Sequence, residues 1–148
     1  MNSQELDQRV RQHVYEVALA TGTPPAISVV TDALGIARDE TEASLQRLAE
    51  AHVLVLQPES RTILMAAPFS AVPTPFLVRT ARYSCFGNCV WDALGVAAML
   101  QTDVRIDTSC QDCGTPMTIE VRSGGVSHDG LVHFAIPARE WWADIVFT

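Results

Sequence analysis

A thiol and a carboxyl group stand three residues apart in the segment Cys89-Val-Trp-Asp92. The apolar residues around this segment predict a helix, and positions three apart share one helical face. A helix N-terminus favours the thiolate form of cysteine, which binds soft metal ions. A carboxyl beside it can hold and deliver a proton. The spacing therefore predicts a thiolate with a proton donor, or alternatively a buried, inert cysteine with a helix-capping aspartate.

A second pair of cysteines, Cys110 and Cys113, encloses two residues and precedes the turn sequence Gly-Thr-Pro. This spacing is typical of half of a zinc site, and a tetrahedral site needs four ligands. A thioredoxin-like redox motif is disfavoured, because the pair lies between predicted strands instead of at a helix N-terminus. The further ligand candidates in the sequence are Cys85, Cys89, His128 and His133.

The first 65 residues, which lack cysteine, have the pattern of a separate helical unit. Their apolar spacing predicts three short helices, followed by a two-stranded hairpin with its turn at residues 58–61. Ser28 is the expected N-cap of the second helix, and Gly35 is its expected end. Three helices and a hairpin form the winged-helix pattern, so residues 1–65 are expected to be a winged-helix-like domain.

The charge of the chain argues against a nucleic-acid partner. The net charge is −7, and residues 1–60 hold four arginines against nine acidic residues. Binding to phosphates depends on several cationic contacts, which the acidic third helix does not offer. We therefore expect no DNA binding by this unit.

The sequence also lacks the features of a membrane or exported protein. No apolar run approaches the roughly 20 residues that span a bilayer. The N-terminal residues show no basic segment followed by an apolar one, so no signal peptide is expected. A cytoplasmic location follows as the expectation, and cysteines there are normally thiols or metal ligands.

The rest of the chain divides into a connector and a second domain. Residues 66–80 contain three prolines and are expected to form an extended linker. Residues 81–148 predict one helix, near residues 88–101, and strands in the segments DVRIDTSC, PMTIEVRS and LVHFAIPA. The expected fold class is α+β, with the cysteine-bearing helix packed on a small, mostly antiparallel sheet.

Residues 76–148 resemble the catalytic domain of the alkylmercury lyase (organomercurial lyase) family. The resemblance rests on the order of Cys89-x-x-Asp92, the apolar helix LGVAAML, the strand DVRIDTS, and Cys110 followed by Gly114-Thr-Pro116. Members of the family also carry a winged-helix-like N-terminal region that does not bind DNA. The resemblance therefore extends over nearly the whole chain.

The resemblance implies an enzyme of mercury detoxification that cleaves carbon–mercury bonds by protonolysis, giving a hydrocarbon and Hg(II). Cys89 would be the mercury-binding thiolate, Asp92 would handle the proton, and Cys110 would be structural. No organic cofactor would be required. The substrate would be a small organomercurial, and small thiols or a mercuric reductase would remove the Hg(II) product.

The family pattern includes a second catalytic cysteine, and no cysteine follows Cys113 in this sequence. Cys85 would supply the second thiol if the helix begins early, and Cys113, which is extra relative to the family pattern, is the other substitute. Two alternatives to the lyase remain. One is a non-catalytic relative that binds zinc or mercury through some of Cys85, Cys89, Cys110 and Cys113. The other is a metal-responsive regulator.

Overall fold

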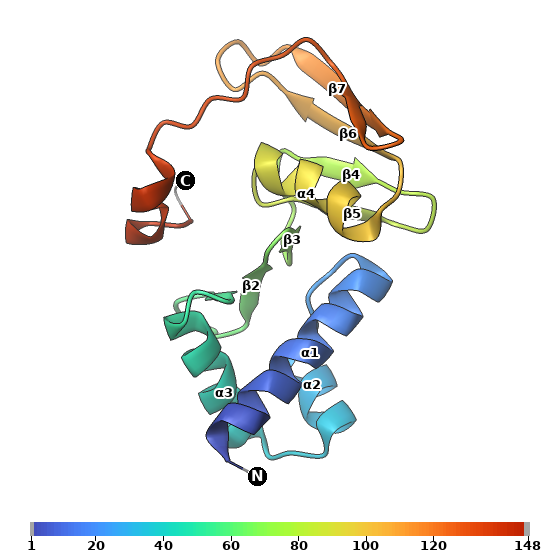
Figure 1. The fold of residues 1–148 in the computed structure, drawn as a ribbon. Coiled ribbons are helices and arrows are strands. Elements are labelled where there is room, and N and C mark those ends of the chain that lie inside the picture. Colours follow the sequence, from blue (N-terminus) through green and yellow to red (C-terminus); the bar gives the residue numbers. More distant parts are fainter. Residues whose placement is uncertain (1, 147–148) are drawn as a thin grey trace.

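Three helices form the N-terminal part of the protein in a computed structural model that describes residues 2–146 (Figure 1). They are α1 (Ser3–Thr21), α2 (Ile27–Leu34) and α3 (Arg38–Glu50). The expected N-cap of α2 is wrong, because Ala26 occupies the cap and Ser28 lies inside the helix. Gly35 ends α2 in the left-handed conformation, as its position predicts.

An ion pair joins α1 to α3. The guanidinium of Arg47 donates to both carboxylate oxygens of Asp7, at 2.7 and 2.9 Å, and the Ser44 hydroxyl donates to the same carboxylate at 2.6 Å. Hydrogen bonding to Arg47 holds the pKa of Asp7 below its usual value. The helical unit is therefore fixed by a polar contact as well as by its apolar interior.

Two antiparallel sheets follow. The first has the order β1-β2-β3 and the second the order β5-β4-β6-β7-β8. The hairpin predicted around residues 58–61 is confirmed, since β1 and β2 pair on either side of it. The α+β class and the helix packed on an antiparallel sheet are also confirmed. The elements are β1 (Val55–Leu56), β2 (Ile63–Ala66), β3 (Phe69–Ser70), β4 (Leu77–Arg79), β5 (Ser84–Phe86), α4 (Val90–Leu100), β6 (Val104–Ser109), β7 (Pro116–Arg122) and β8 (Gly125–Ser127).

The segment 66–80, expected as an extended linker, contains the last residue of β2, the whole of β3 and the whole of β4. Phe69 of β3 is fully buried and forms a bridge with Gly87, so this segment packs into the second part of the molecule. The assignment of domains 1–65 and 81–148 remains a prediction.

No helix within residues 2–146 combines the length and the hydropathy that crossing a bilayer would require.

The strand expected in LVHFAIPA does not form. Residues 128–137 contain neither helix nor strand, and a short 3₁₀ helix, η1 (Ala138–Ala143), follows. The neighbouring edge strand β8 is three residues long and exposed throughout, so it offers no buried surface to a further strand. This C-terminal segment leaves the sheet and runs back toward the N-terminal part (Figure 1).

The interior consists of two apolar clusters, and α1 contributes to both. One cluster packs α1 to α3 with β2, and includes Val10 and Val14. The other lies between α4 and the five-stranded sheet, and includes Ala18 and Phe69. The Tyr83 hydroxyl also donates to the Leu19 carbonyl at 2.8 Å, which fastens the end of α1 to the loop before β5.

Gly87 lies where the chain turns from β5 into α4, and its backbone is buried. A Cβ atom at this position would approach the backbone nitrogen of Ala93 to 2.6 Å and its Cα to 2.8 Å. Because those atoms belong to the helix backbone, they cannot move aside as a flexible side chain would. Glycine is therefore required for α4 to start where it does.

We expect Gly87→Ala to lower the free energy of unfolding by about 1–3 kcal/mol, the usual cost of forcing an extra carbon into a packed interior. Gly95→Ala is the matched control. Its Cβ would meet only Pro68, at an ordinary 3.5 Å, and alanine favours the helix. Thermal unfolding of both variants checks this, and equal melting temperatures would contradict the packing argument.

Candidate active site

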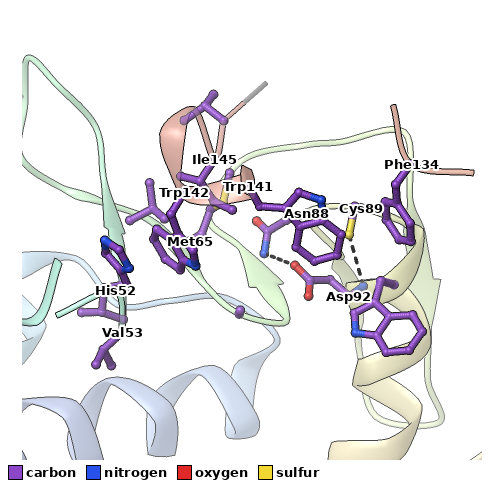
Figure 2. A pocket seen from close by; sticks show the side chains of 15 residues that line it. His52, Val53, Met65, Asn88, Cys89, Asp92, Phe134, Trp141, Trp142 and Ile145 are labelled. Carbon is purple, nitrogen blue, oxygen red and sulfur yellow. Dashed lines mark hydrogen bonds between the residues drawn. The ribbon is translucent and has the colours of Figure 1, made fainter. Parts of the chain in front are cut away.

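Cys89 is the N-cap residue of α4. Its backbone is extended, and its sulfur accepts a hydrogen bond from the backbone N–H of Asp92 at 3.5 Å. The thiol is half-buried. Sequence spacing predicted that Cys89 and Asp92 project together from the first turn. In the structure, both side chains line one cavity (Figure 2).

Asn88 holds the carboxylate of Asp92. Its side-chain amide donates to Asp92 Oδ2 at 2.8 Å, and the same nitrogen lies 3.4 Å from the Phe69 carbonyl oxygen. The Asn88 Oδ1 atom is buried and has no hydrogen-bond partner among the described residues. Sequence reasoning missed Asn88, although its position four residues before Asp92 is a signal that would have found it.

Burial raises the pKa of both reactive groups. For Cys89 the N–H groups of Asp92 and Trp91 act in the opposite direction, but burial is the larger effect. The expectation of a thiol pKa lowered by the helix N-terminus is therefore wrong in sign. Burial likewise raises the pKa of Asp92, against the hydrogen bond from Asn88. Burial therefore opposes the charged form of both groups.

The cavity has a volume of about 210 Å³ and lies between three parts of the chain. The first turn of α4 forms one wall, and residues 52–55 and 65–67 of the N-terminal part lie opposite. The C-terminal segment closes a third side (Figure 2). Most of the lining is apolar or aromatic, and this includes Met65, Trp91, Phe134, Trp141 and Trp142.

Two contacts place the C-terminal segment. The ring of Trp142 stacks on His52, with 4.1 Å between centroids and 2° between planes. The indole N–H of Trp141 donates to the Ile136 carbonyl at 2.9 Å, and its ring lies 4.9 Å from that of Phe134. The tryptophans thus form part of the cavity wall. His52 was not anticipated, because no pattern in the sequence links it to residue 142.

Cys85 does not reach the cavity. It lies on β5, before α4 begins, and it is 2% exposed within the apolar cluster beneath that helix. Burial raises the pKa of its thiol to about 11. The hypothesis that Cys85 shares a helical face with Cys89 is therefore wrong, because the helix begins only at Val90.

Cys110 and Cys113 lie together in the turn between β6 and β7, and neither lines the cavity. The hydroxyl of Thr115, 3.1 Å from the Cys113 sulfur, is the main cause of a lowered pKa for that exposed thiol. Within residues 2–146, no three histidine, cysteine or acidic side chains are grouped as around a metal ion. The four-cysteine metal site allowed by the sequence is not assembled.

We expect the four thiols to react with iodoacetamide in an order set by exposure and thiolate fraction. Cys113 should be modified first, and Cys85 only after unfolding, with Cys89 and Cys110 between them. Peptide mapping by mass spectrometry at neutral pH measures each rate. The same protein in guanidinium should show nearly equal rates, and rapid modification of Cys85 in the folded protein would contradict its placement.

Comparison with known proteins bears on the family and the fold of the chain. The family model described as alkylmercury lyase matches residues 69–148, which is more than half of the chain. No curated protein matches the chain. Among solved structures, the crystal structure of the mercury-bound form of MerB2 is similar, with a TM-score of 0.63 and 21% sequence identity.

That structural similarity covers 80% of this chain and 58% of the MerB2 chain, and at this level of identity it shows a shared fold. The chain thus spans less than two thirds of the length of its structural neighbour. The resemblance found in the sequence from residue 76 onward falls inside the matched region. The chain belongs to the alkylmercury lyase family.

Proposed function

We propose that this protein cleaves the carbon–mercury bond of small organomercurials by protonolysis. One observation carries the proposal: the first turn of α4 presents the thiol of Cys89 and the carboxyl of Asp92 to the same largely apolar cavity. Membership of the alkylmercury lyase family supports it. The cavity draws its walls from both parts of the chain, so we propose that domains 1–65 and 81–148, with the connector 66–80, form the site together.

Cys89 binds the metal in the first step. The thiol replaces the leaving ligand of the organomercurial, forming a sulfur–mercury bond and releasing one proton. Mercury(II) is a soft ion, and thiolate is its preferred protein ligand, so the metal displaces the proton even from a thiol with a raised pKa. The proton passes to Asp92, whose burial favours the protonated carboxyl.

Asp92 then returns the proton to carbon. A second thiolate on mercury increases the electron density at the metal, the carbon–mercury bond breaks, and its electron pair takes the proton from Asp92. The hydrocarbon leaves, mercury is held by two sulfur atoms, and Asp92 is a carboxylate. Asn88 positions that carboxylate through its 2.8 Å hydrogen bond and stabilises its charge.

The second thiolate is proposed to come from a small cellular thiol. Among the residues that line the cavity, Cys89 is the one cysteine, because Cys85 is in the core and Cys113 is on the β6–β7 turn. A further small thiol would release Hg(II) from Cys89, or a mercuric reductase would accept it. This chemistry suits the reducing cytoplasm, where we propose that the protein acts.

The aromatic walls suit the organic group of the substrate. Phe134 and Trp141, which are partly buried, line the cavity with Cys89 and would exclude water from the reacting carbon. A water-poor site strengthens the attraction between the proton of the Asp92 carboxyl and the negative charge that develops on carbon.

We expect Cys89→Ser to abolish the release of benzene from phenylmercuric acetate in the presence of excess small thiol. Asp92→Asn should reduce turnover by at least about 100-fold, because it removes proton transfer but leaves the mercury-binding thiol. Headspace gas chromatography measures benzene. Mass spectrometry of the intact protein should show a phenylmercury adduct on Asp92→Asn but no adduct at position 89 on Cys89→Ser.

Asp39→Asn is the matched control, since Asp39 is an exposed carboxyl in the first turn of α3, and it should keep full turnover. Wild-type protein should bind phenylmercury but release no benzene when small thiol is omitted, because the second thiolate is then missing. Wild-type protein that binds phenylmercury but releases no benzene even with excess small thiol would instead establish the non-catalytic, thiolate-binding alternative.

We expect Asn88→Ala to extend activity to higher pH by roughly one unit. The asparagine donates a hydrogen bond to the charged carboxylate, which is worth about 1.5 kcal/mol, so its loss raises the pKa of Asp92 further. The protonated acid then persists to higher pH. The other titratable groups near Asp92 are Cys89, His52 and Tyr15, and none is changed.

The measurement is the pH profile of benzene release at saturating small thiol. Gln8→Ala is the control, because it removes an exposed side-chain amide from α1, and its profile should match the wild type. An unchanged alkaline limb in Asn88→Ala would show that Asp92 does not supply the proton that limits the rate.

A further inference from the structure

The turn between β6 and β7 holds two thiols that the proposed reaction does not use. The last pair of the β6–β7 ladder is Ser109 with Pro116, and the next backbone bond runs from the Cys110 N–H to the Thr115 carbonyl at 2.8 Å. Within the turn, the Gly114 N–H donates to the Cys110 carbonyl at 2.8 Å. The four residues between Cys110 and Thr115 are thus folded tightly back on the end of the sheet.

Gly114 permits this geometry. Its φ is +72°, a left-handed conformation that residues with a Cβ rarely adopt, and nothing would contact a Cβ there. The requirement at this position is therefore for backbone conformation, not for space. Because of the turn, the Cys113 sulfur lies 3.1 Å from the Thr115 hydroxyl. The side chain of Cys110 is, after Thr115, a further cause of the lowered pKa of the Cys113 thiol.

Both thiols are free and accessible from solvent. Neither belongs to a disulfide, Cys113 is exposed, and Cys110 is half-buried. Neither lines the cavity of Cys89 and Asp92. Most free cysteines are buried and inert, but these two lie in one short surface turn that two backbone hydrogen bonds close.

We propose that Cys110 and Cys113 form a second binding site, for a soft cation that two thiolates can satisfy, such as Hg²⁺. On binding, each thiol loses its proton to solvent, two sulfur–metal bonds form, and no electron is transferred. Zinc would be held weakly, since it requires four ligands and no third ligand is grouped with this pair among residues 2–146. The site is independent of the proposed lyase activity.

The advantage of the pair over a single cysteine is its effective concentration. Once one sulfur has bound the ion, the second is held a few bonds away in the same turn, where its local concentration is millimolar or higher. A small monothiol at about 0.1 mM is at least about tenfold more dilute than the second sulfur of the pair, so it competes poorly with the pair but displaces the ion from an isolated cysteine. This difference makes the proposal testable.

The test titrates reduced, full-length protein with mercuric chloride in the presence of about 0.1 mM monothiol, and counts retained metal by native mass spectrometry. Wild type and Cys89→Ser should each retain one Hg²⁺. Cys110→Ser and Cys113→Ser should each bind at least about tenfold more weakly. Gln111→Ala, an exposed substitution in the same turn, is the matched control and should bind like the wild type.

Loss of the retained ion in Cys89→Ser, or its survival in Cys110→Ser and Cys113→Ser, would overturn the proposal. Circular dichroism of each variant shows whether it is folded. Iodoacetamide mapping provides a second readout, because Hg²⁺ should protect Cys110 and Cys113 together in the wild type. Benzene release by the Cys110 and Cys113 variants is measured in parallel. If the lyase proposal fails, no variant releases benzene, but the number of retained Hg²⁺ ions still tests the second site.

Discussion

The close contact between Gly87 and the first turn of α4 determines the geometry of the site. Because no side chain intervenes, the helix begins directly after β5, and Cys89 falls at the N-cap instead of inside the strand or one turn into the helix. From that position the sulfur and the carboxyl of Asp92 are one turn apart and face the same cavity. Asn88, between Gly87 and Cys89, then reaches the Asp92 carboxylate. Three functional side chains thus depend on one backbone contact.

Two opposing effects act on the reactive groups, and burial is the stronger in both. The helix N-terminus and its N–H groups favour the thiolate of Cys89, while the removal of water favours the thiol. The same removal of water favours the acid form of Asp92. Burial therefore opposes charge on either group, which suits an apolar cavity. In the proposed reaction the metal displaces the proton of Cys89, and Asp92 holds that proton until carbon accepts it.

Local patterns were sufficient to predict most of the fold. Helical spacing located α1 to α4 and alternation located β6 and β7, because each of these elements buries one regular face. The same alternation failed for LVHFAIPA, where Phe134 faces the cavity without a neighbouring strand. Spacing also predicted the pair Cys89 and Asp92. It could not place His52 against Trp142, or Cys85 in the core, because those positions depend on contacts between residues far apart in the sequence.

The shared role of α1 has a consequence for how the molecule unfolds. Val10 and Val14 belong to the apolar cluster of the N-terminal helices, while Ala18, two turns on from Val10, belongs to the cluster beneath α4. A helix is cooperative along its length, so disruption of one cluster frays the helix that the other requires. The two halves of the molecule are therefore linked thermodynamically as a single cooperative unit, and the cavity between them persists only while both are folded.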